Sequence, residues 1–196
     1  MKQLIFGLAL LVALPVQATS SLQQMIEEAS DTLLDEMRLN AEAYKSDPQK
    51  IYDLVDAVVL PHFDFEAMTG LALGRYNDQV SSEQRPEIVN EFRHLLVRTY
   101  SSALLEYTDQ SVVFLPMEGS EADGEVIVRA EIQQAGGFPI PINYRFRNGD
   151  DGWKVIDVSV DDVSLVTNYR SSFARAIKKD GVDGLIQTLR ERNQSQ

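Results

Sequence analysis

Cysteine is absent from this 196-residue chain, and histidine occurs only twice. Without cysteine the protein forms no disulfide, no metal thiolate and no thiol nucleophile. His62 lies in a proline-flanked turn and His94 falls off the apolar stripe of a predicted helix, and neither has a histidine partner at metal-ligand spacing. Signatures such as His-Glu-x-x-His, Gly-x-Ser-x-Gly and a phosphate-binding glycine loop are also missing. We therefore expect no enzyme, no metal and no cofactor.

Long hydrophobic runs are also lacking. The longest, Leu4 to Leu14, is about half as long as a membrane-spanning helix requires. Pro15 and then Val16-Gln17-Ala18 follow it, which is the small-residue ending of a secretory signal. We predict that residues 1–18 are a cleaved signal peptide and that residues 19–196 form a single exported domain. In a Gram-negative host this domain would be periplasmic.

Positive charge is scarce, since 18 Lys and Arg residues stand against 30 Asp and Glu, a net charge of −12. Such an excess of acid argues against binding nucleic acid and allows only transient proximity to an anionic membrane. Basic residues slightly outnumber acidic ones only between residues 129 and 179. The candidates there for contact with a phosphate headgroup or an acidic partner surface are Arg129, Arg145, Arg147 and Lys154. Ordinary solvated strand residues would have the same pattern.

The first half of the chain has apolar residues spaced by three and four, which predicts amphipathic helices. The stripe from Leu22 to Tyr44 predicts one continuous helix. Asp64 is the expected N-cap of a short helix that Gly74 ends. Ser81 and Gln84 have the spacing of a capping box at the start of a longer helix.

After about residue 107 the apolar spacing changes from 3.6 to 2, which predicts β-strands. The expected strands are residues 111–115, 124–134, 138–147 and 153–160, joined by short turns. A helix over about residues 165–177, a break at Gly181 and a last short helix complete the chain. This order predicts an α+β fold in which a twisted antiparallel sheet of four to five strands is covered on one face by helices.

The third predicted strand contains two prolines, Pro139 and Pro141, on the same side of the strand. Proline has no N–H to donate, so we expect that side to be an unpaired edge. Ile140 and Ile142 alternate with the prolines and face the helices. The sheet edge would then lie beside an apolar surface, either as the lip of a cleft or simply as protection against aggregation.

Five segments, spread over nearly the whole chain after residue 18, resemble the MlaC family, also called the toluene-tolerance family. They are LALGRY (71–76), TY (99–100), PIPINYR (139–145), GWKVIDVSVDDVSLVTNYRSSF (152–173) and GVDGLI (181–186). Two positions depart from the family pattern. Asn77 stands where tryptophan is common, and Asp161-Asp162 replaces a commoner Glu-Gly.

The resemblance implies a periplasmic carrier of glycerophospholipid that holds the acyl chains in an apolar cavity between sheet and helices. Its implied partners are an outer-membrane lipoprotein and porin complex and an inner-membrane ABC transporter with its periplasmic lipid-binding subunit. Such a carrier maintains outer-membrane lipid asymmetry and needs no cofactor. By this analogy the apolar stripes are candidate cavity lining: Met68, Leu71, Leu96, Tyr100, Leu104, Tyr107, Val126, Val128, Ile132, Ile140, Ile142, Tyr144, Phe146, Val158 and Val160. A filled hydrophobic core would show the same pattern.

Two other functions stay open at this point. An isomerase, dehydratase or hydrolase with a deep apolar pocket needs a titratable group inside that pocket, and Asp157 is the candidate. A periplasmic holdase or adaptor would instead present an exposed apolar groove to other proteins.

Overall fold

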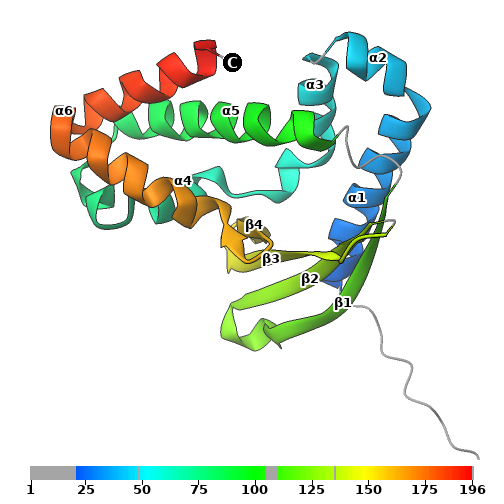
Figure 1. The fold of residues 1–196 in the computed structure, drawn as a ribbon. Coiled ribbons are helices and arrows are strands. Elements are labelled where there is room, and N and C mark those ends of the chain that lie inside the picture. The colour runs from blue at the N-terminus through cyan, green and yellow to red at the C-terminus, as the bar shows by residue number, and fades with distance from the viewer. Residues whose placement is uncertain (1–20, 48, 105–109, 135, 196) are drawn as a thin grey trace, which may run out of the picture.

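The computed structural model of the chain describes residues 21–47, 49–104, 110–134 and 136–195. Helices come first, a sheet follows and a long helix closes the chain, as the apolar spacing predicts (Figure 1). The first-half helices are α1 (Ser21–Leu39), α2 (Ala41–Ser46), α3 (Gln49–Val58), α4 (Phe65–Leu73) and α5 (Gln84–Leu104), with 3₁₀ turns η1 (Leu60–His62) and η2 (Gly74–Gln79). The predicted signal peptide and Tyr107 lie outside the described residues.

The helix boundaries follow their capping residues, as predicted. Asp64 accepts a hydrogen bond from the Ala67 backbone N–H at 2.8 Å, and Gly74 ends α4 in a positive-φ conformation that favours glycine. At the start of α5 the Gln84 N–H donates to the Ser81 hydroxyl at 3.2 Å, and the Ser81 N–H donates to the Gln84 side chain at 3.1 Å. This pair is the reciprocal capping box.

The prediction of one helix from residue 22 to residue 44 is wrong, because the chain breaks at Asn40 into α1 and α2. The Asn40 amide donates to the backbone carbonyl of Glu36 at 3.3 Å and to its carboxylate at 3.0 Å. Asparagine side chains compete in this way with the helical backbone, so the apolar stripe continues through a bend. The bend lets α2 turn away from the line of α1 (Figure 1).

The sheet has five antiparallel strands in sequence order, which confirms the α+β prediction. They are β1 (Ser111–Ser120), β2 (Glu125–Gln133), β3 (Ile140–Gly149), β4 (Gly152–Val160) and β5 (Val163–Ser164), with a 3₁₀ turn, η4 (Glu121–Asp123), between the first two. β1 extends five residues beyond its predicted end at Leu115. Its register shifts between Leu115 and Glu118, a bulge that accommodates Pro116 on an edge strand.

The expectation that Pro139 and Pro141 mark an edge strand is wrong, because β3 is the central strand and pairs with both β2 and β4. The Pro141 carbonyl accepts from the Asp161 N–H at 2.9 Å, so the proline nitrogen faces the same side, toward the end of β4. β4 ends at Val160 and turns into β5 through Asp161 and Asp162, which both have positive φ. The missing donors therefore lie where the neighbouring strand has stopped.

The closing helix α6 (Leu165–Ser195) is kinked at Gly181, where the backbone leaves the helical region, as the sequence predicts. Its two arms lie along α5 (Figure 1). The buried side chains of α4, α5 and α6 form one helical core, whose centre is Phe92 in edge-to-face contact with Tyr169 and Phe173. A second core joins the start of α1 to part of the sheet, and a third joins α1, α2, α3 and α5. These cores surround the space described next.

Candidate functional site

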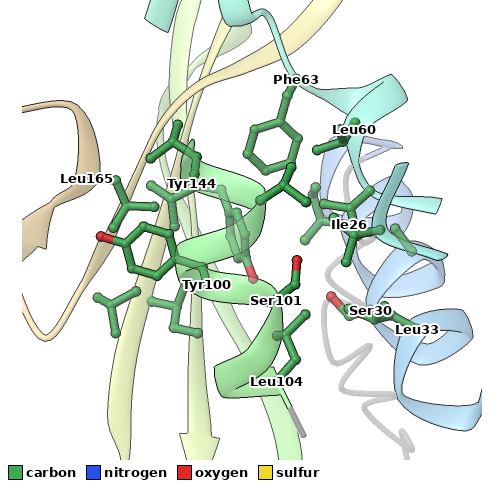
Figure 2. Close-up of a pocket in the computed structure, with 18 of the residues that line it drawn as sticks. Ile26, Ser30, Leu33, Leu60, Phe63, Tyr100, Ser101, Leu104, Tyr144 and Leu165 are labelled. Carbon is green, nitrogen blue, oxygen red and sulfur yellow. The ribbon is translucent and has the colours of Figure 1, made fainter. Parts of the chain in front are cut away.

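A cavity of about 380 Å³ lies between the inner face of the sheet and the helices α1, α3 and α5, with η1 and the start of α4 closing one side. Side chains from all these elements point into it (Figure 2). The residues that line it are Ile26, Ala29, Ser30, Leu33, Val55, Val59, Leu60, Phe63, Phe65, Met68, Leu96, Val97, Tyr100, Ser101, Leu104, Ile132, Ile140, Ile142, Tyr144, Val158, Val160 and Leu165. Nearly all of this surface is hydrocarbon.

The inner face of the sheet is filled at one end and hollow at the other. At the filled end Val128 and Phe146 are fully buried against Leu22 and Ile26 of α1. At the hollow end Ile142 and Val160 pair across β3 and β4 and face the cavity. Val160 is 36 % exposed, whereas every other lining residue is less exposed, so the cavity wall is most accessible to solvent at this end.

Most of the predicted lining residues lie in the cavity wall: Met68, Leu96, Tyr100, Leu104, Ile132, Ile140, Ile142, Tyr144, Val158 and Val160. Others lie elsewhere. Val126, Val128 and Phe146 belong to the filled end of the sheet, and Leu71 packs against the helical core. All four fall on apolar stripes, and the stripe pattern is the same for filled and hollow regions.

The prediction missed the contributions of α1, α3 and η1 to the cavity wall. These include Ala29, Leu33, Val55 and Leu60, and Phe63 follows directly after η1. Leu33 and Val55 do lie on the apolar stripes of their helices, so the signal that these positions are buried is present. Which cluster each stripe covers depends on the bend at Asn40 and on the path of the chain through η1.

Four hydroxyl groups interrupt the apolar wall, those of Ser30, Ser101, Tyr100 and Tyr144. The Tyr144 hydroxyl bonds Ser30, whereas the Tyr100 hydroxyl bonds Tyr169 of α6. Burial raises the pKa of Tyr144 to about 12, although the Ser30 hydrogen bond opposes this. Burial also raises the pKa of Tyr100 to about 12, with the neighbouring Tyr169 adding to the effect. Both phenols are therefore neutral at physiological pH.

The four cations proposed for headgroup or partner contact are absent from the cavity wall. Arg129, Arg145 and Arg147 alternate along β2 and β3 with the inward-facing residues of the sheet, so they face its other side. Arg129 pairs with Glu118 at 2.6 Å and Arg147 with Glu125 at 2.8 Å. The Lys154 ammonium donates to the Pro61 carbonyl at 2.7 Å and holds η1 to the sheet. For Arg145, the buried Nε has no hydrogen-bond partner within the described residues.

The acidic candidate for catalysis, Asp157, also lies outside the cavity wall. Its carboxylate accepts from the Ser164 hydroxyl at 2.7 Å and from the Val166 N–H at 3.3 Å, so it fixes the start of α6.

Asp161 and Asp162 form the β4–β5 turn. In the described part of the chain, no three acidic, histidine or cysteine side chains gather as metal ligands. His62 has a lowered pKa because of burial and the nearby Lys154 charge.

The cavity is suited to a ligand with a long apolar part, since its wall offers hydrocarbon contact and few polar groups. The fold and the cavity together define a binding protein for a hydrophobic small molecule. Over the residues that the structure covers, no helix is both long and apolar enough to span a membrane.

The chain belongs to the MlaC family, whose sequence profile, described as "MlaC protein", matches residues 27–191. One relative, the toluene tolerance protein ttg2D of Pseudomonas putida, is 26 % identical over 179 residues, which cover 90 % of this chain and 83 % of that protein. Another is the intermembrane phospholipid transport system binding protein MlaC of Haemophilus influenzae. It is 28 % identical over 187 residues, covering 93 % of this chain and 87 % of the relative.

A solved structure has the same fold. It is the phospholipid-binding protein from Ralstonia solanacearum in complex with a phospholipid, at 1.53 Å resolution. The two chains are 34 % identical with a TM-score of 0.80, and the match covers 88 % of this chain and 97 % of the other. The names of the relatives describe phospholipid binding and transport, which confirms the family resemblance seen in the sequence.

Proposed function

We propose that this protein is a periplasmic phospholipid carrier that encloses acyl chain in the cavity and leaves the headgroup in water. The hydrocarbon-lined cavity, most accessible to solvent beside Val160, is the observation that carries this proposal. The phospholipid bound by the Ralstonia protein supports it. None of the cations proposed for the headgroup lines the cavity, which agrees with a headgroup that stays outside.

The energetics of lipid transfer explain why a cavity is needed. Each methylene group costs roughly 0.8 kcal/mol to expose to water, so two 16-carbon chains cost on the order of 20 to 25 kcal/mol. An acyl chain that moves from a bilayer into this cavity exchanges one hydrocarbon environment for another, so most of the cost of exposing it to water cancels. The carrier then needs neither a cofactor nor catalysis, and the direction of transfer has to come from its partners.

We propose the same route that the family resemblance implies. The protein, exported by the signal peptide at residues 1–18, carries glycerophospholipid between an outer-membrane lipoprotein and porin complex and an inner-membrane ABC transporter with its periplasmic lipid-binding subunit. The intermembrane transport system in the name of the Haemophilus relative supports this assignment. Its outcome would be the maintenance of outer-membrane lipid asymmetry.

Partner docking is proposed for the cation-bearing outer face of the sheet, with Arg145 as its central residue. Arg129 and Arg147 are already paired with glutamates, whereas no ion pair of Arg145 is found among the described residues. Arg145→Glu should slow lipid exchange with the reconstituted transporter complex. Arg175→Glu, on the exposed surface of α6, makes the same change in net charge and serves as its control. Equal exchange by both variants would remove the docking role.

Native mass spectrometry of the freshly purified protein tests the carrier function. We expect a phospholipid bound in stoichiometric amount. Ala29→Trp places an indole in the cavity and should reduce bound lipid at least tenfold, whereas Glu28→Trp adds the same side chain to the exposed face of α1 and should not. An empty wild-type protein that binds unfolded clients would support the holdase instead. Turnover of a small molecule would support the enzyme.

A further inference from the structure

Three hydroxyl groups from three different elements face the cavity. Ser30 comes from α1, Ser101 from α5 and Tyr144 from β3. Figure 2 shows the two serine hydroxyls and the phenol of Tyr144 turned toward the same part of the pocket, while the Tyr100 hydroxyl points away from them. We call Ser30, Ser101 and Tyr144 the hydroxyl cluster. Apolar side chains surround it on all the neighbouring positions of the wall.

The cluster has more hydrogen-bond donors than it uses. Three hydroxyls hold three hydrogens, and the bond between Ser30 and Tyr144 consumes only one of them. The Ser101 side chain is only 2 % exposed, yet no hydrogen bond of its hydroxyl is found within the described residues. Other helical hydroxyls behave differently. Thr69 and Thr188 each donate to a carbonyl one turn earlier, at 2.7 and 2.8 Å.

The Ser101 hydroxyl faces the cavity, and a donor without an acceptor costs free energy, so the cavity contents have to supply an acceptor. The remaining hydrogens suit a group that accepts hydrogen bonds and donates none. A carbonyl oxygen, with two lone pairs, is such a group. A saturated hydrocarbon chain offers nothing to these hydrogens.

The depth of the cluster indicates which carbonyl it meets. Tyr144 lies two residues along β3 from Ile142, which pairs with Val160, the most exposed lining residue. Two strand residues span about 7 Å. Tyr144 therefore lies a short way along β3 from the most exposed part of the cavity wall. In a glycerophospholipid whose headgroup is outside and whose chains are inside, the ester linkages occupy this depth.

We propose that the hydroxyl cluster is a subsite for an ester carbonyl of the bound lipid, so that the cavity selects ester-linked over ether-linked phospholipids. This inference rests on the proposed carrier function. An ether oxygen is a poorer acceptor than a carbonyl oxygen, while headgroup and chains are the same in the two lipids. One net hydrogen bond changes a binding constant by about two- to tenfold.

The test is a competition between two lipids that differ only in this linkage. The full-length mature protein is incubated with vesicles that contain equal amounts of diester and diether phosphatidylglycerol with identical saturated chains. Bound lipid is then identified by native mass spectrometry. We expect the wild-type protein to hold about three- to tenfold more diester than diether lipid. Ser101→Ala and Tyr144→Phe should bring the ratio near one in the lipid that each variant retains.

Ser172→Ala is the matched control, because Ser172 is a helical serine outside the cavity wall whose hydroxyl donates to the Tyr169 carbonyl at 2.8 Å. It should keep the wild-type preference. A wild-type ratio near one, with lipid fully bound, would overturn the subsite and leave the carrier function standing; the hydroxyls would then be satisfied by water. A preference that survives in both cluster variants would also overturn it. Binding of neither lipid would overturn the carrier function itself.

Discussion

Helix α5 contributes to both the helical core and the cavity wall. Its first part packs in the filled core, whereas its C-terminal part borders the cavity. Near the middle, Phe92 is fully buried, with ring centroids 5.1 Å from Tyr169 and 5.0 Å from Phe173. Near the C-terminal end, Ser101 and Leu104 border a cavity of about 380 Å³. Both ends are apolar on their inner side. The difference is that α4 and α6 pack against the first part of α5, whereas at the C-terminal part α3 lies beside α5 and the sheet lies across the cavity.

This contrast shows how the protein can keep a hollow interior. A cavity forgoes the dispersion contacts of a filled core, which weakens the folded state. The helical core of α4, α5 and α6 is contiguous and well filled, so it supplies contacts that the sheet side lacks. Stability and binding are then served by different regions, and substitutions in the two regions should have different consequences.

The largest effect is expected from breaking the filled region at its centre. Phe92→Ala removes both edge-to-face contacts and leaves a void that the surrounding helices cannot close, so it should lower the free energy of unfolding by about 3–5 kcal/mol. Urea denaturation followed by circular dichroism measures this. A loss of less than about 1 kcal/mol would mean that the helical core is not the main source of stability.

A matched pair of leucines in α5 compares the two regions directly. Leu95 is 2 % exposed and belongs to the helical core, whereas Leu104 lines the cavity. Leu95→Ala should cost about 2–5 kcal/mol of unfolding free energy, and Leu104→Ala about 1 kcal/mol or less, because part of its surface already meets empty space. If both variants lost the same unfolding free energy in lipid-free protein, the difference between the filled core and the cavity wall would be contradicted.

Removing the lipid should make the hollow region weaker still. A ligand that binds only the folded state stabilises it by about 2.7 kcal/mol at a free concentration of 100 Kd. For a domain of this size, each kcal/mol shifts the Tm by about 2–4 °C, so delipidation should lower the Tm by about 5–10 °C. Differential scanning calorimetry of loaded and stripped protein measures the shift, and adding phospholipid back should restore it. An unchanged Tm would argue against a lipid-filled cavity.

The smallest effect concerns pH, and it comes from the two cavity tyrosines. Burial raises the pKa of Tyr144 and of Tyr100 to about 12, whereas an unfolded tyrosine titrates near 10. Between pH 10 and 12 the unfolded state loses these protons first, so stability that is complete below pH 10 falls as the pH rises. Urea denaturation at pH 9 and pH 11 measures the loss of unfolding free energy between these two pH values, and Tyr144→Phe should make this loss smaller. An equal loss in the variant and the wild type would show that the pKa of Tyr144 does not change on folding.

The elements were predictable where local chemistry decides them. Asp64, Gly74, the Ser81–Gln84 box and the kink at Gly181 each fixed a boundary by hydrogen bonds or backbone conformation within a few residues. Asn40 was the exception, because its side chain competes with the helix although the apolar stripe continues. The prediction from Pro139 and Pro141 was wrong for a related reason. A proline indicates only that no neighbouring strand needs a donor at that position, and it does not indicate that the whole strand lies at an edge.

The site was predictable only as a set of buried positions. Ile142 and Phe146 lie on the same stripe of β3, but one faces the cavity and the other is buried against α1. Ser101 carried no signal at all, since a single serine on an apolar helix face is ordinary.

By itself the sequence determined the apolar stripes, the caps and turns, and therefore the α+β order of elements, because these depend on neighbours along the chain. Only the tertiary structure decided where those stripes meet and where they stay apart. Helix α1 packs on the sheet through Leu22 and Ile26 and borders the cavity from Ile26 onward. No local pattern encodes this change, since a side chain that faces empty space and one that faces a neighbour have the same chemistry.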